Sequence, residues 1–428
     1  MNAKVGAGLM TDADQVEPKK IVVIGAGITG ASAALFLQRD GHDVTLIEQG
    51  DSATGTSSGN AGVISLAGCV PLAVPGILQR VPKMLMDPYG PLSIRWRYLP
   101  KLTPWLIKFV QNSAMARVRA NAHAKASLLD HAMSAYNILL DAADAQGFVQ
   151  RRGLLKLYGT YASFAQAALD RELYQECGRR FDVVGGDEIR DLEPALKPVF
   201  KHGFYFDDNA GVRDPGGLVV KFVETFCAKG GALVKASVNG FSGEPGARIV
   251  ATSDGDFPAE QIVVAAGSWS AGLMKRFGVS IVLDAERGYH IMLPQPDETL
   301  NGPVALMDHS IFVSPMAHGL RMTSGVELGG NAAPADYTRI RRMMATVGDA
   351  VEGVRLEEQS AWLGFRPSTP SGVPFIDRAP GQEDIILAAG GGHIGMTLGP
   401  VLGRMVSDLA ADRDTGVDMS PYRIDRKF

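Results

Sequence analysis

The sequence predicts an α/β fold in which a dinucleotide-binding domain, assembled from separate parts of the chain, carries an inserted domain built on an antiparallel sheet. The first observation is an apolar run at 21–24 that leads directly into Gly25-Ala26-Gly27-Ile28-Thr29-Gly30. The second is a glycine-rich strand–loop–helix pattern in residues 385–411, at the far end of the chain. The third is a series of strand-like runs between 281 and 324 with no long helix among them. Together they favour a discontinuous, Rossmann-like domain with an insertion.

The glycine motif after the first strand has the residue types that a pyrophosphate site needs. Gly25 permits a tight turn, Gly27 lets the backbone approach a phosphate, and Gly30 lets the following helix pack closely on the strand. The helix, expected over 31–39, directs its positive end at the phosphates. We therefore expect all six residues of the motif, from Gly25 to Gly30, to bind a dinucleotide.

A second buried strand, expected at 44–47, ends in Glu48 and is followed by Gln49. An acidic residue about 20 residues after the glycines is placed to bind ribose hydroxyls. A carboxylate at this point favours a free 2′-hydroxyl and disfavours a 2′-phosphate, because two anions would otherwise meet.

The stretch 54–62 is dense in small and hydroxyl residues, which indicates a loop with many free backbone N–H groups. Such a loop can wrap a phosphate or a flat ring. A plain surface turn is the alternative interpretation. The candidate cofactor-binding residues here are Thr56, Ser57, Asn60, Ala61 and Gly62.

Length, charge and cysteine content exclude several classes. The chain has 428 residues, 46% of them hydrophobic, which is enough for two or three domains. A net charge of −4 gives no basic footprint for nucleic acid. Cys69, Cys177 and Cys227 are far apart, so the sequence favours neither a metal site nor a disulfide framework, and suits a reducing cytoplasm.

Residues 1–19 lack the apolar core of a signal peptide and are expected to be a flexible leader. No run of about 18 apolar residues predicts a membrane span.

The segment 71–113 mixes seven prolines with tryptophans, other apolar residues and basic residues. Short helices that begin at prolines are the expected structure. Two interpretations stand: an amphipathic patch that touches a membrane or a partner subunit, and ordinary packing of a helical insertion over the core.

Hydrophobic periodicity and capping residues predict the other elements. Asp214-Pro215 is a helix start, because Asp caps free N–H groups and Pro suits the first turn. Helices are expected at 114–145 (stopped by Gly147), 161–177, 188–192, 214–229, 270–277, 337–351 and 395–411. Strands are expected at 153–158, 232–238, 249–252, 261–268, 281–283, 289–293, 304–307, 311–314, 320–324 and 385–387.

These elements predict a division in which the dinucleotide-binding domain is formed by residues 20–70, 199–280 and 361–428. The helical segment and the first part of the substrate domain occupy 71–198, and its second part occupies 281–360.

The sequence resembles the D-amino-acid oxidase superfamily of glutathione-reductase-type flavoproteins over nearly the whole chain, from Lys20 to Arg413. Within it the sequence is most similar to the small subunit of bacterial D-amino-acid dehydrogenase. The resemblance is carried by the 25–30 motif, Glu48, Asn60-Ala61-Gly62, Ala265-Ala266-Gly267-Ser268-Trp269, the run 364–374 that begins Gly-Phe-Arg-Pro, and the loop 390–397.

The resemblance implies non-covalent FAD as cofactor and assigns further residues. Arg366 should hold a substrate carboxylate, which agrees with the bidentate geometry of a guanidinium; a structural arginine paired with an internal acid is the alternative. Tyr289 should lie near flavin and substrate or form part of the wall, and Val238 should meet the adenine. His393 should contact substrate or shape its turn. The loop and helix start should line the flavin and stabilise negative charge on it. The further candidates are Ala266, Gly267, Gly391, Gly392, His393, Ile394, Gly395, Met396 and Thr397.

Three residues depart from the dehydrogenase pattern. Ser371 stands where Asp is usual, Arg287 where Lys is common, and His290 where a small hydroxyl residue is common. These departures concern the substrate rather than the fold.

The resemblance predicts oxidation of an amino acid, of D configuration, at its Cα–N bond, with electrons passed to a quinone-type acceptor. The flavin carries this chemistry, so no catalytic acid, base or nucleophile motif is required. The alternatives are a secondary or cyclic amine substrate such as D-proline, hydroxyproline or sarcosine, an O₂-using oxidase, and a non-catalytic flavin-binding subunit. The expected location is the cytoplasm, with peripheral contact at the inner face of the membrane if 71–113 docks there.

Overall fold

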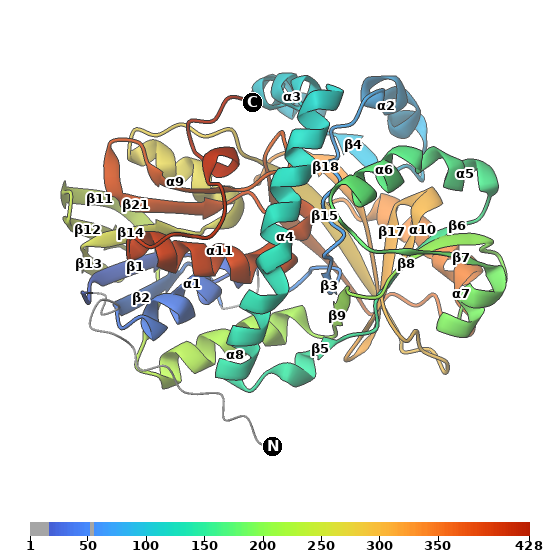
Figure 1. Cartoon of the computed structure of the whole chain (residues 1–428), viewed down its shortest axis with the longest axis horizontal. Helices are drawn as coiled ribbons and strands as arrows, with labels where there is room; N and C mark the ends of the chain where they lie inside the picture. Colours follow the sequence, from blue (N-terminus) through green and yellow to red (C-terminus); the bar gives the residue numbers. More distant parts are fainter. Residues whose placement is uncertain (1–16, 52–54) are drawn as a thin grey trace, which may run out of the picture.

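The computed structural model describes residues 17–51 and 55–428. Most of the predicted leader, and Thr54 of the predicted loop, lie outside the described residues. Figure 1 shows two sheet-based halves, with the long helix α4 (Met115–Ala143) running between them.

The first half is built on a six-stranded sheet that gathers distant parts of the chain. Its strand order is β10 (Ala232–Lys235), β2 (Asp43–Glu48), β1 (Lys20–Ile24), β14 (Gln261–Val264), β21 (Gln382–Ala389) and β20 (Phe375–Ala379). The first five strands are parallel, and β20 pairs antiparallel with β21. The carboxyl ends of the parallel strands therefore meet at one edge, where α/β sheets bind ligands.

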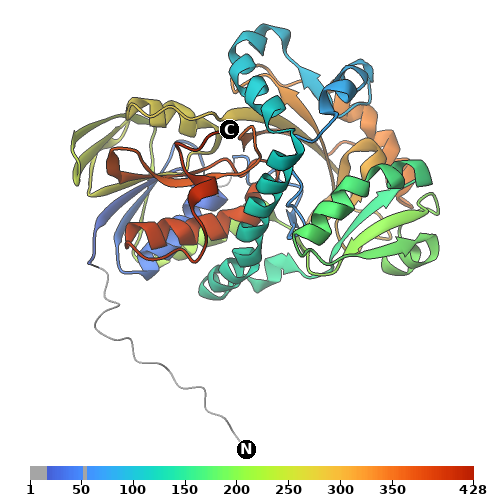
Figure 2. The ribbon, with the colours of Figure 1, turned by 45° about the horizontal axis from the view of Figure 1, so that its top comes forward.

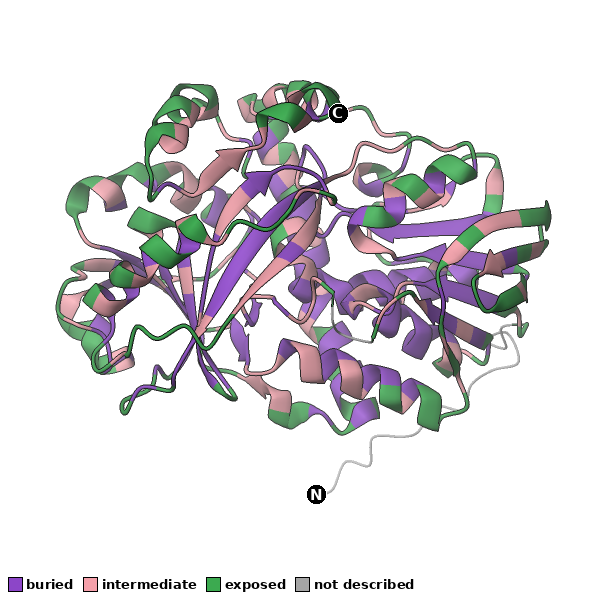
Figure 3. Ribbon diagram, turned by 180° about the vertical axis from the view of Figure 1, so that it is seen from behind, coloured by how far each residue is buried: buried purple, intermediate pink, exposed green. Residues whose placement is uncertain are grey.

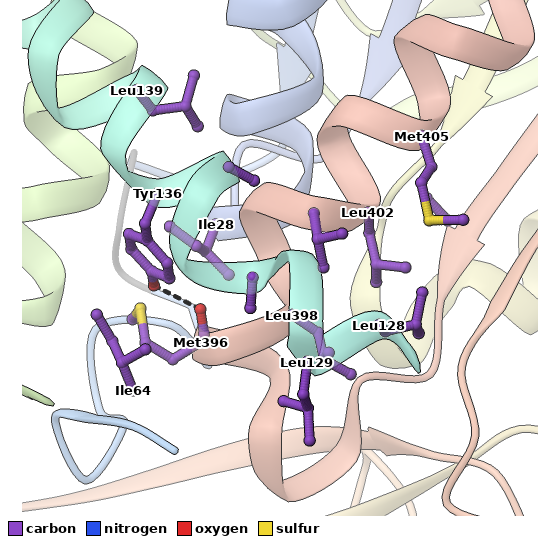
Figure 4. Close-up of a cluster of buried hydrophobic side chains, with 14 of the residues drawn as sticks. Ile28, Ile64, Leu128, Leu129, Tyr136, Leu139, Met396, Leu398, Leu402 and Met405 are labelled. Atoms are coloured by element: carbon purple, nitrogen blue, oxygen red, sulfur yellow. Dashed lines mark hydrogen bonds between the residues drawn. The ribbon is translucent and has the colours of Figure 1, made fainter. Parts of the chain in front are cut away.

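Both faces of this sheet are covered, because its central strands are apolar on both sides. Helices α1 (Ile28–Arg39), α8 (Pro215–Ala228), α11 (Gly395–Ala410) and α4 pack on one face. In Figure 4, Tyr136 of α4 donates a hydrogen bond to the carbonyl of Met396 in α11 (2.5 Å) within this apolar cluster. The other face carries α9 (Ser270–Arg276) and a hairpin sheet of β11 (Val238–Glu244), β12 (Ala247–Thr252) and β13 (Gly255–Ala259).

The second half is built on a nine-stranded sheet. Its order is β19 (Ser360–Ser368), β15 (Asp284–Leu293), β18 (Gly319–Leu328), β17 (Ile311–Met316), β16 (Val304–Leu306), β6 (Leu154–Tyr158), β8 (His202–Phe206) and β7 (Asp182–Gly185), with β4 (Leu92–Ile94) beside β18. Helix α10 (Thr338–Ala350) packs on its outer face. The predicted antiparallel sheet is thus mixed, since β6 and β4, from the earlier segment, pair parallel with β16 and β18.

The remaining elements join the two halves or lie at the periphery. A small ladder of β3 (Val63–Ile64), β9 (Ala210–Val212) and β5 (Val149–Gln150) connects them. The other helices are α2 (Ile77–Met86), α3 (Leu99–Gln111), α5 (Tyr161–Gln166), α6 (Ala168–Glu176) and α7 (Gly186–Leu192). Figure 2 shows α2 and α3 at one end of the molecule, beside β4.

Several predicted elements need correction. The helix expected at 161–177 is two helices, because Ala167 (φ −80°, ψ 14°) leaves the helical conformation. Helix α4 ends at Ala143, where Asp144 is left-handed, rather than at the expected residue 145. The strand expected at 232–238 ends at Lys235, and Val238 begins the hairpin sheet. The strand expected at 281–283 is absent, and β15 begins at Asp284.

Strand pairing also places two stretches in the sheet opposite to the one predicted. Residues 361–368, expected in the dinucleotide-binding domain, lie in β19 and pair with β15 of the nine-stranded sheet. Likewise β8, within the expected 199–280 part, pairs with β6 and β7. Both corrections arise because strand partners distant in sequence decide sheet membership. The division of the chain into domains as a whole stays a prediction.

Candidate active site

A cavity of about 600 Å³ opens at the carboxyl edge of the six-stranded sheet. Its walls come from the segments that follow β1, β2, β14 and β21, together with residues 362–367 of β19. We call it the first cavity. The strand ends that the sequence predicted to surround a dinucleotide therefore meet around one space.

The glycine motif has the close approaches predicted for it. Gly25 is left-handed (φ 103°), and a Cβ there would lie 2.6 Å from the carbonyl oxygen of Ala265. A Cβ on Gly30 would lie 1.8 Å from the carbonyl oxygen of Gly25. Only glycine fits at these two positions, so the turn and the approach of α1 to β1 both depend on the absence of a side chain.

Glu48 lines the first cavity at the end of β2 and is held there by backbone donors. Its Oε2 accepts from the N–H of Ala26 (2.7 Å), and its Oε1 accepts from the N–H of Gly50 (3.2 Å). These bonds fix the carboxylate while leaving lone pairs for hydroxyl groups. The geometry suits the predicted ribose contact.

The loop 55–62 is tied to both halves of the molecule. Thr56 bonds through its hydroxyl to both the N–H (3.1 Å) and the carbonyl (3.0 Å) of Phe365 in β19. Ser57 Oγ accepts from the N–H of Ile28 at the start of α1 (3.0 Å). The loop is therefore a built wall of the cavity rather than a plain surface turn.

Side chains of the nine-stranded sheet hold the middle of the same loop. Gly59 lies against Trp362, since a Cβ there would be 2.1 Å from the ring. His290 stacks on Trp362 (5.1 Å between ring centres) and has its Nδ1 3.0 Å from the carbonyl oxygen of Gly59. Arg321 donates to the carbonyls of Ser58 (2.9 Å) and Asn60 (2.6 Å).

Most of the predicted cofactor residues line the first cavity. They are Gly25, Gly27, Ile28, Thr29, Glu48, Gln49, Thr56, Ser57, Asn60, Val238, Ala266, Gly267, Gly391, Gly392, Gly395 and Met396. Four others line neither this cavity nor the next, namely Ala26, Gly30, Gly62 and Thr397. Thr397, for example, is fully buried, and its hydroxyl accepts from the N–H of Ser65 (2.9 Å).

A second cavity of about 280 Å³ adjoins the first. The two share Asn60, Arg366, Gly391 and Gly392 as wall residues, and the second also includes Ala61, His393 and Ile394. Its floor is the inner face of the nine-stranded sheet. A ligand in this cavity would thus lie against the ligand of the first.

Arg366 stands between the two cavities. Its guanidinium lies over Gly288, where a Cβ would be 2.2 Å away, and it donates to the carbonyl of Gly325 (2.8 Å). Within the described part of the chain this is its one hydrogen bond. Burial lowers the pKa of Arg366, an effect opposed by the negative charge of Glu286. A half-buried guanidinium with donors to spare, facing a cavity, is suited to a carboxylate.

Glu286 and His393 form an acid–base pair beside this arginine. His393 Nε2 lies 2.6 Å from Glu286 Oε2, and Glu286 is the cross-strand partner of Arg366. Burial alone would raise the pKa of Glu286, but the charge and hydrogen bond of His393, with the charge of Arg366, bring it below its usual value. Glu286 is therefore an ionised acceptor, so His393 carries a proton on Nε2.

The structure does not bring Tyr289 together with Arg366, Glu286 and His393. Its hydroxyl bonds to Glu327 and lines a third cavity, of about 210 Å³, together with Arg95 and Asp336. Arg287 is equally remote from the second cavity, since Glu327 and the carbonyls of Gly330, Ala333 and Pro334 occupy its donors. Tyr289 is thus a wall residue of another cavity, which matches the alternative left open for it.

Sequence reasoning missed several wall residues. Glu286, Lys125 and Lys156 line the second cavity, while Trp269 and Phe365 line the first and pack edge to face. A signal existed for Glu286, because two adjacent charged residues, Glu286 and Arg287, stand just before the strand predicted at 289–293. Lys125 and Lys156 gave no such signal, since long-range packing alone brings them to the cavity.

The first cavity fits FAD in the chemistry of its walls. Glycine backbone lines it at the start of α1 and of α11. The carboxylate of Glu48 lies at the end of β2, and the rings of Trp269 and Phe365 form part of the wall. Helix starts with free N–H groups suit the pyrophosphate and a negatively charged ring.

Comparisons with known proteins agree with this geometry. A family model described as FAD-dependent oxidoreductase matches residues 20–409. A D-amino-acid oxidase from Bradyrhizobium diazoefficiens is 32% identical over 95% of this chain and 98% of its own. A D-amino acid dehydrogenase from Allorhizobium ampelinum is 28% identical over 95% and 98%.

Solved structures share the fold at lower identity. Glycine oxidase from Geobacillus kaustophilus superposes with a TM-score of 0.72 at 20% identity, covering 96% of this chain and all of that one. L-proline dehydrogenase from P. horikoshii gives 0.73 at 18%, covering 95% and 98%. The chain therefore belongs to the DAO family of FAD-dependent oxidoreductases.

Proposed function

We propose that this chain oxidises the Cα–N bond of a D-amino acid to an imino acid, which water hydrolyses to a 2-oxo acid and ammonia. The observation that carries the proposal is Arg366, half-buried between two adjoining cavities with donors to spare. Relatives named D-amino-acid oxidase and D-amino acid dehydrogenase, aligned over nearly their full length, support the substrate class.

Arg366 would bind the substrate carboxylate and orient Cα toward the first cavity. A bidentate contact fixes two oxygens and so limits rotation of the substrate. When bound, the flavin supplies the acceptor for the hydride that leaves Cα. The protein's part is then to position the substrate, which a contact with Arg366 would do.

His393 would remove a proton from the substrate ammonium. Hydride loss from Cα needs a neutral amine, whose lone pair forms the C=N bond. In the neutral form of His393, whose Nε2–H is donated to Glu286, Nδ1 is the basic nitrogen, and the ionised Glu286 stabilises the imidazolium that forms. This extends the predicted substrate contact of His393 to a proton-accepting role.

The candidate cofactor residues that line the first cavity retain their proposed roles, with Glu48 at the ribose and the loop 390–396 along the flavin. We further propose that FAD is held without a covalent bond, because Cys69, Cys177 and Cys227 do not line the first cavity. Acid precipitation of the protein should therefore release FAD into the supernatant.

We propose a quinone-type electron acceptor and peripheral contact with the inner face of the membrane. Six large apolar side chains of residues 71–113 are exposed, namely Leu72, Leu78, Met86, Tyr89, Trp96 and Ile107. Exposed Arg80, Lys83, Arg97 and Lys101 lie among them. Exposed apolar and basic side chains in one segment suit contact with an anionic membrane. No helix in the described ranges is long and apolar enough to cross a bilayer.

The test is anaerobic flavin reduction by a panel of D-amino acids, L-amino acids and N-alkyl glycines. The proposal predicts bleaching of the flavin by D-amino acids first. Faster reduction by N-alkyl glycines or cyclic amines would assign a secondary amine as substrate instead. Failure of every amine would indicate a non-catalytic subunit. With the substrate known, peroxide release in air would distinguish an oxidase from a quinone-linked dehydrogenase.

A further inference from the structure

Two cysteines that are distant in the sequence meet beside the second cavity. The thiol of Cys177, directly after α6, donates a hydrogen bond to the sulfur of Cys69. Both side chains are buried in the apolar cluster to which α4 contributes. Cys69 stands between Gly68 and Val70, two wall residues of the second cavity. The proposed reaction uses neither thiol.

An arginine holds the two segments together. Arg179 donates from Nε to the carbonyl of Cys177 (2.8 Å) and from Nη1 to the carbonyl of Leu66 (3.4 Å). Its guanidinium thus bridges the end of α6 and the turn at 66–69. The pairing of the thiols therefore follows from the packing of two segments of the chain.

The local backbone permits the two sulfur atoms to approach one another. Cys69 lies in a turn, and Cys177 lies between the last residue of α6 and Gly178, whose backbone is left-handed (φ 67°). Sulfur atoms in hydrogen-bond contact need to close by about 2 Å to form a disulfide. Because neither cysteine lies within a helix or strand, this movement breaks no regular ladder of hydrogen bonds.

Positive charges surround this pair and favour the thiolate of Cys69. The hydrogen bond from Cys177 lowers the pKa of the Cys69 thiol to about 7, although burial opposes the change. The charges of Lys125, Arg179 and Lys156 act in the same direction as the hydrogen bond. The thiolate is the form of cysteine that peroxides oxidise, so Cys69 is the expected point of attack.

We propose that Cys69 and Cys177 are a redox-sensitive modification site, which hydrogen peroxide converts to a disulfide. The thiolate of Cys69 attacks one peroxide oxygen, so the O–O bond breaks, hydroxide leaves and a sulfenic acid forms. The sulfur of Cys177 then attacks the sulfur of Cys69, the S–S bond forms, the S–O bond breaks and water leaves. Overall, two thiols lose two electrons and two protons, and one peroxide is reduced to two waters. This proposal does not depend on the proposed function.

The disulfide would fix a turn that forms part of the second cavity. Gly68 lies against Ile394, since a Cβ on the glycine would be 2.8 Å from Cγ2 of the isoleucine. The N–H of Ser65 donates to the hydroxyl of Thr397 (2.9 Å). The turn thus contacts the loop 390–397, and a covalent bond at Cys69 acts on the wall that the two segments share.

The experiment treats the purified holoprotein with hydrogen peroxide, alkylates the remaining thiols in denaturant and maps the peptides by mass spectrometry. We expect free thiols to fall from three to one per chain, with one peptide pair linking Cys69 to Cys177. Cys227 is exposed and should stay a thiol, because partial desolvation raises its pKa. Dithiothreitol should restore all three thiols. Oxidation of Cys227 before the buried pair, or three unchanged thiols, would overturn the proposal.

Variants assign the two steps to the two cysteines. Cys177→Ser should stop at a sulfenic acid on Cys69 that dimedone traps, whereas Cys69→Ser should leave Cys177 a thiol. The matched control, Cys227→Ser, should form the disulfide at the rate of wild type. If either serine variant failed to fold, the peptide map of the wild type would still decide the question.

Hydrogen exchange tests the effect on the cavity wall without any substrate. In Cys227→Ser, oxidation should slow exchange of the amides in 65–70 by about tenfold or more, because the disulfide restricts local opening of the turn. Peroxide should leave the exchange of these amides unchanged in Cys177→Ser. A disulfide that forms without slowing this exchange would overturn the link to the second cavity.

Discussion

At the scale of single residues, Arg366 carries most of the functional argument. Arg366→Leu should weaken apparent substrate affinity by roughly 30-fold or more, because truncating one partner of a buried charge pair costs about 2–5 kcal/mol and each 1.4 kcal/mol is tenfold. Arg366→Lys should recover only part, since an ammonium cannot form the bidentate contact. The concentration dependence of flavin reduction measures both.

The control for this prediction is Arg342→Leu, at an exposed position on α10. FAD content should match wild type in all three variants. If Arg366→Leu instead lost flavin while its remaining holoenzyme kept normal affinity, Arg366 would be a structural partner of Glu286. His393 and the two lysines that line the second cavity, Lys125 and Lys156, would then be the first places to seek the carboxylate site.

At the scale of elements, the loop 55–62 depends on a histidine that must stay neutral. Burial, aided by the charge of Arg321, lowers the pKa of His290 to about 4, whereas its unfolded value is near 6.5. As pH falls, His290 therefore binds a proton in the unfolded state before it does so in the folded state. The contribution of neutral His290 to the free energy of unfolding is complete above pH 6.5 and is lost as pH falls toward 4. Between pH 7 and 5 this loss is about 2 kcal/mol.

His290→Asn keeps a donor near the position of Nδ1 and removes the titration. Urea unfolding at pH 7 and pH 5 should therefore show a smaller drop in unfolding free energy for this variant than for wild type. His123→Asn, at an exposed position on α4, is the control and should match wild type. Equal drops in wild type and His290→Asn would show that His290 is already protonated in the folded state.

The segment around α2 and α3 gives a second prediction at this scale. Helix α2 has no buried residue, and Figure 3 shows this end of the molecule coloured mostly exposed or intermediate. Trp96 (67% exposed) and Met86 (78% exposed) are suited to insert into a bilayer surface. The double change Trp96→Ser and Met86→Ser should thus reduce co-sedimentation with anionic liposomes, whereas Tyr161→Ser, at an exposed position on α5, should not.

Wild-type protein that stays in the supernatant with and without lipid would favour the packing alternative. That alternative already holds for part of the segment. Trp105 is buried against Leu328 and donates to the carbonyl of Ser368 (2.9 Å), so it cannot serve as a membrane anchor. Trp96 is exposed and Trp105 is buried, a difference that the composition of the segment could not predict.

The elements that local chemistry determines were predictable from the sequence. The close approaches at Gly25 and Gly30, the position of Glu48, and the cap that Asp214 gives α8 through the N–H of Gly217 (2.8 Å) all follow from neighbours in the chain. Residues whose surroundings come from distant strands were not. Arg366 was placed in the wrong sheet because β19 pairs with β15, and the same pairing brings Glu286 to Arg366.

At the scale of the whole molecule, each of the two halves forms a different cavity of the candidate active site. The six-stranded sheet directs its strand ends at one cavity, and the nine-stranded sheet forms the floor of the other. Arg366 belongs to the second sheet yet reaches both cavities. Changes in the nine-stranded sheet can therefore alter the second cavity without altering the strand ends that line the first.

The central claim is that this chain converts a D-amino acid to a 2-oxo acid through its flavin. The most direct test is an anaerobic single turnover with the D-amino acid that reduces the flavin fastest, and with its L-enantiomer. We predict one 2-oxo acid and one ammonia released for each flavin reduced by the D-enantiomer, and no product from the L-enantiomer. Reduction by the L-enantiomer alone, or bleaching without 2-oxo acid, would contradict the account.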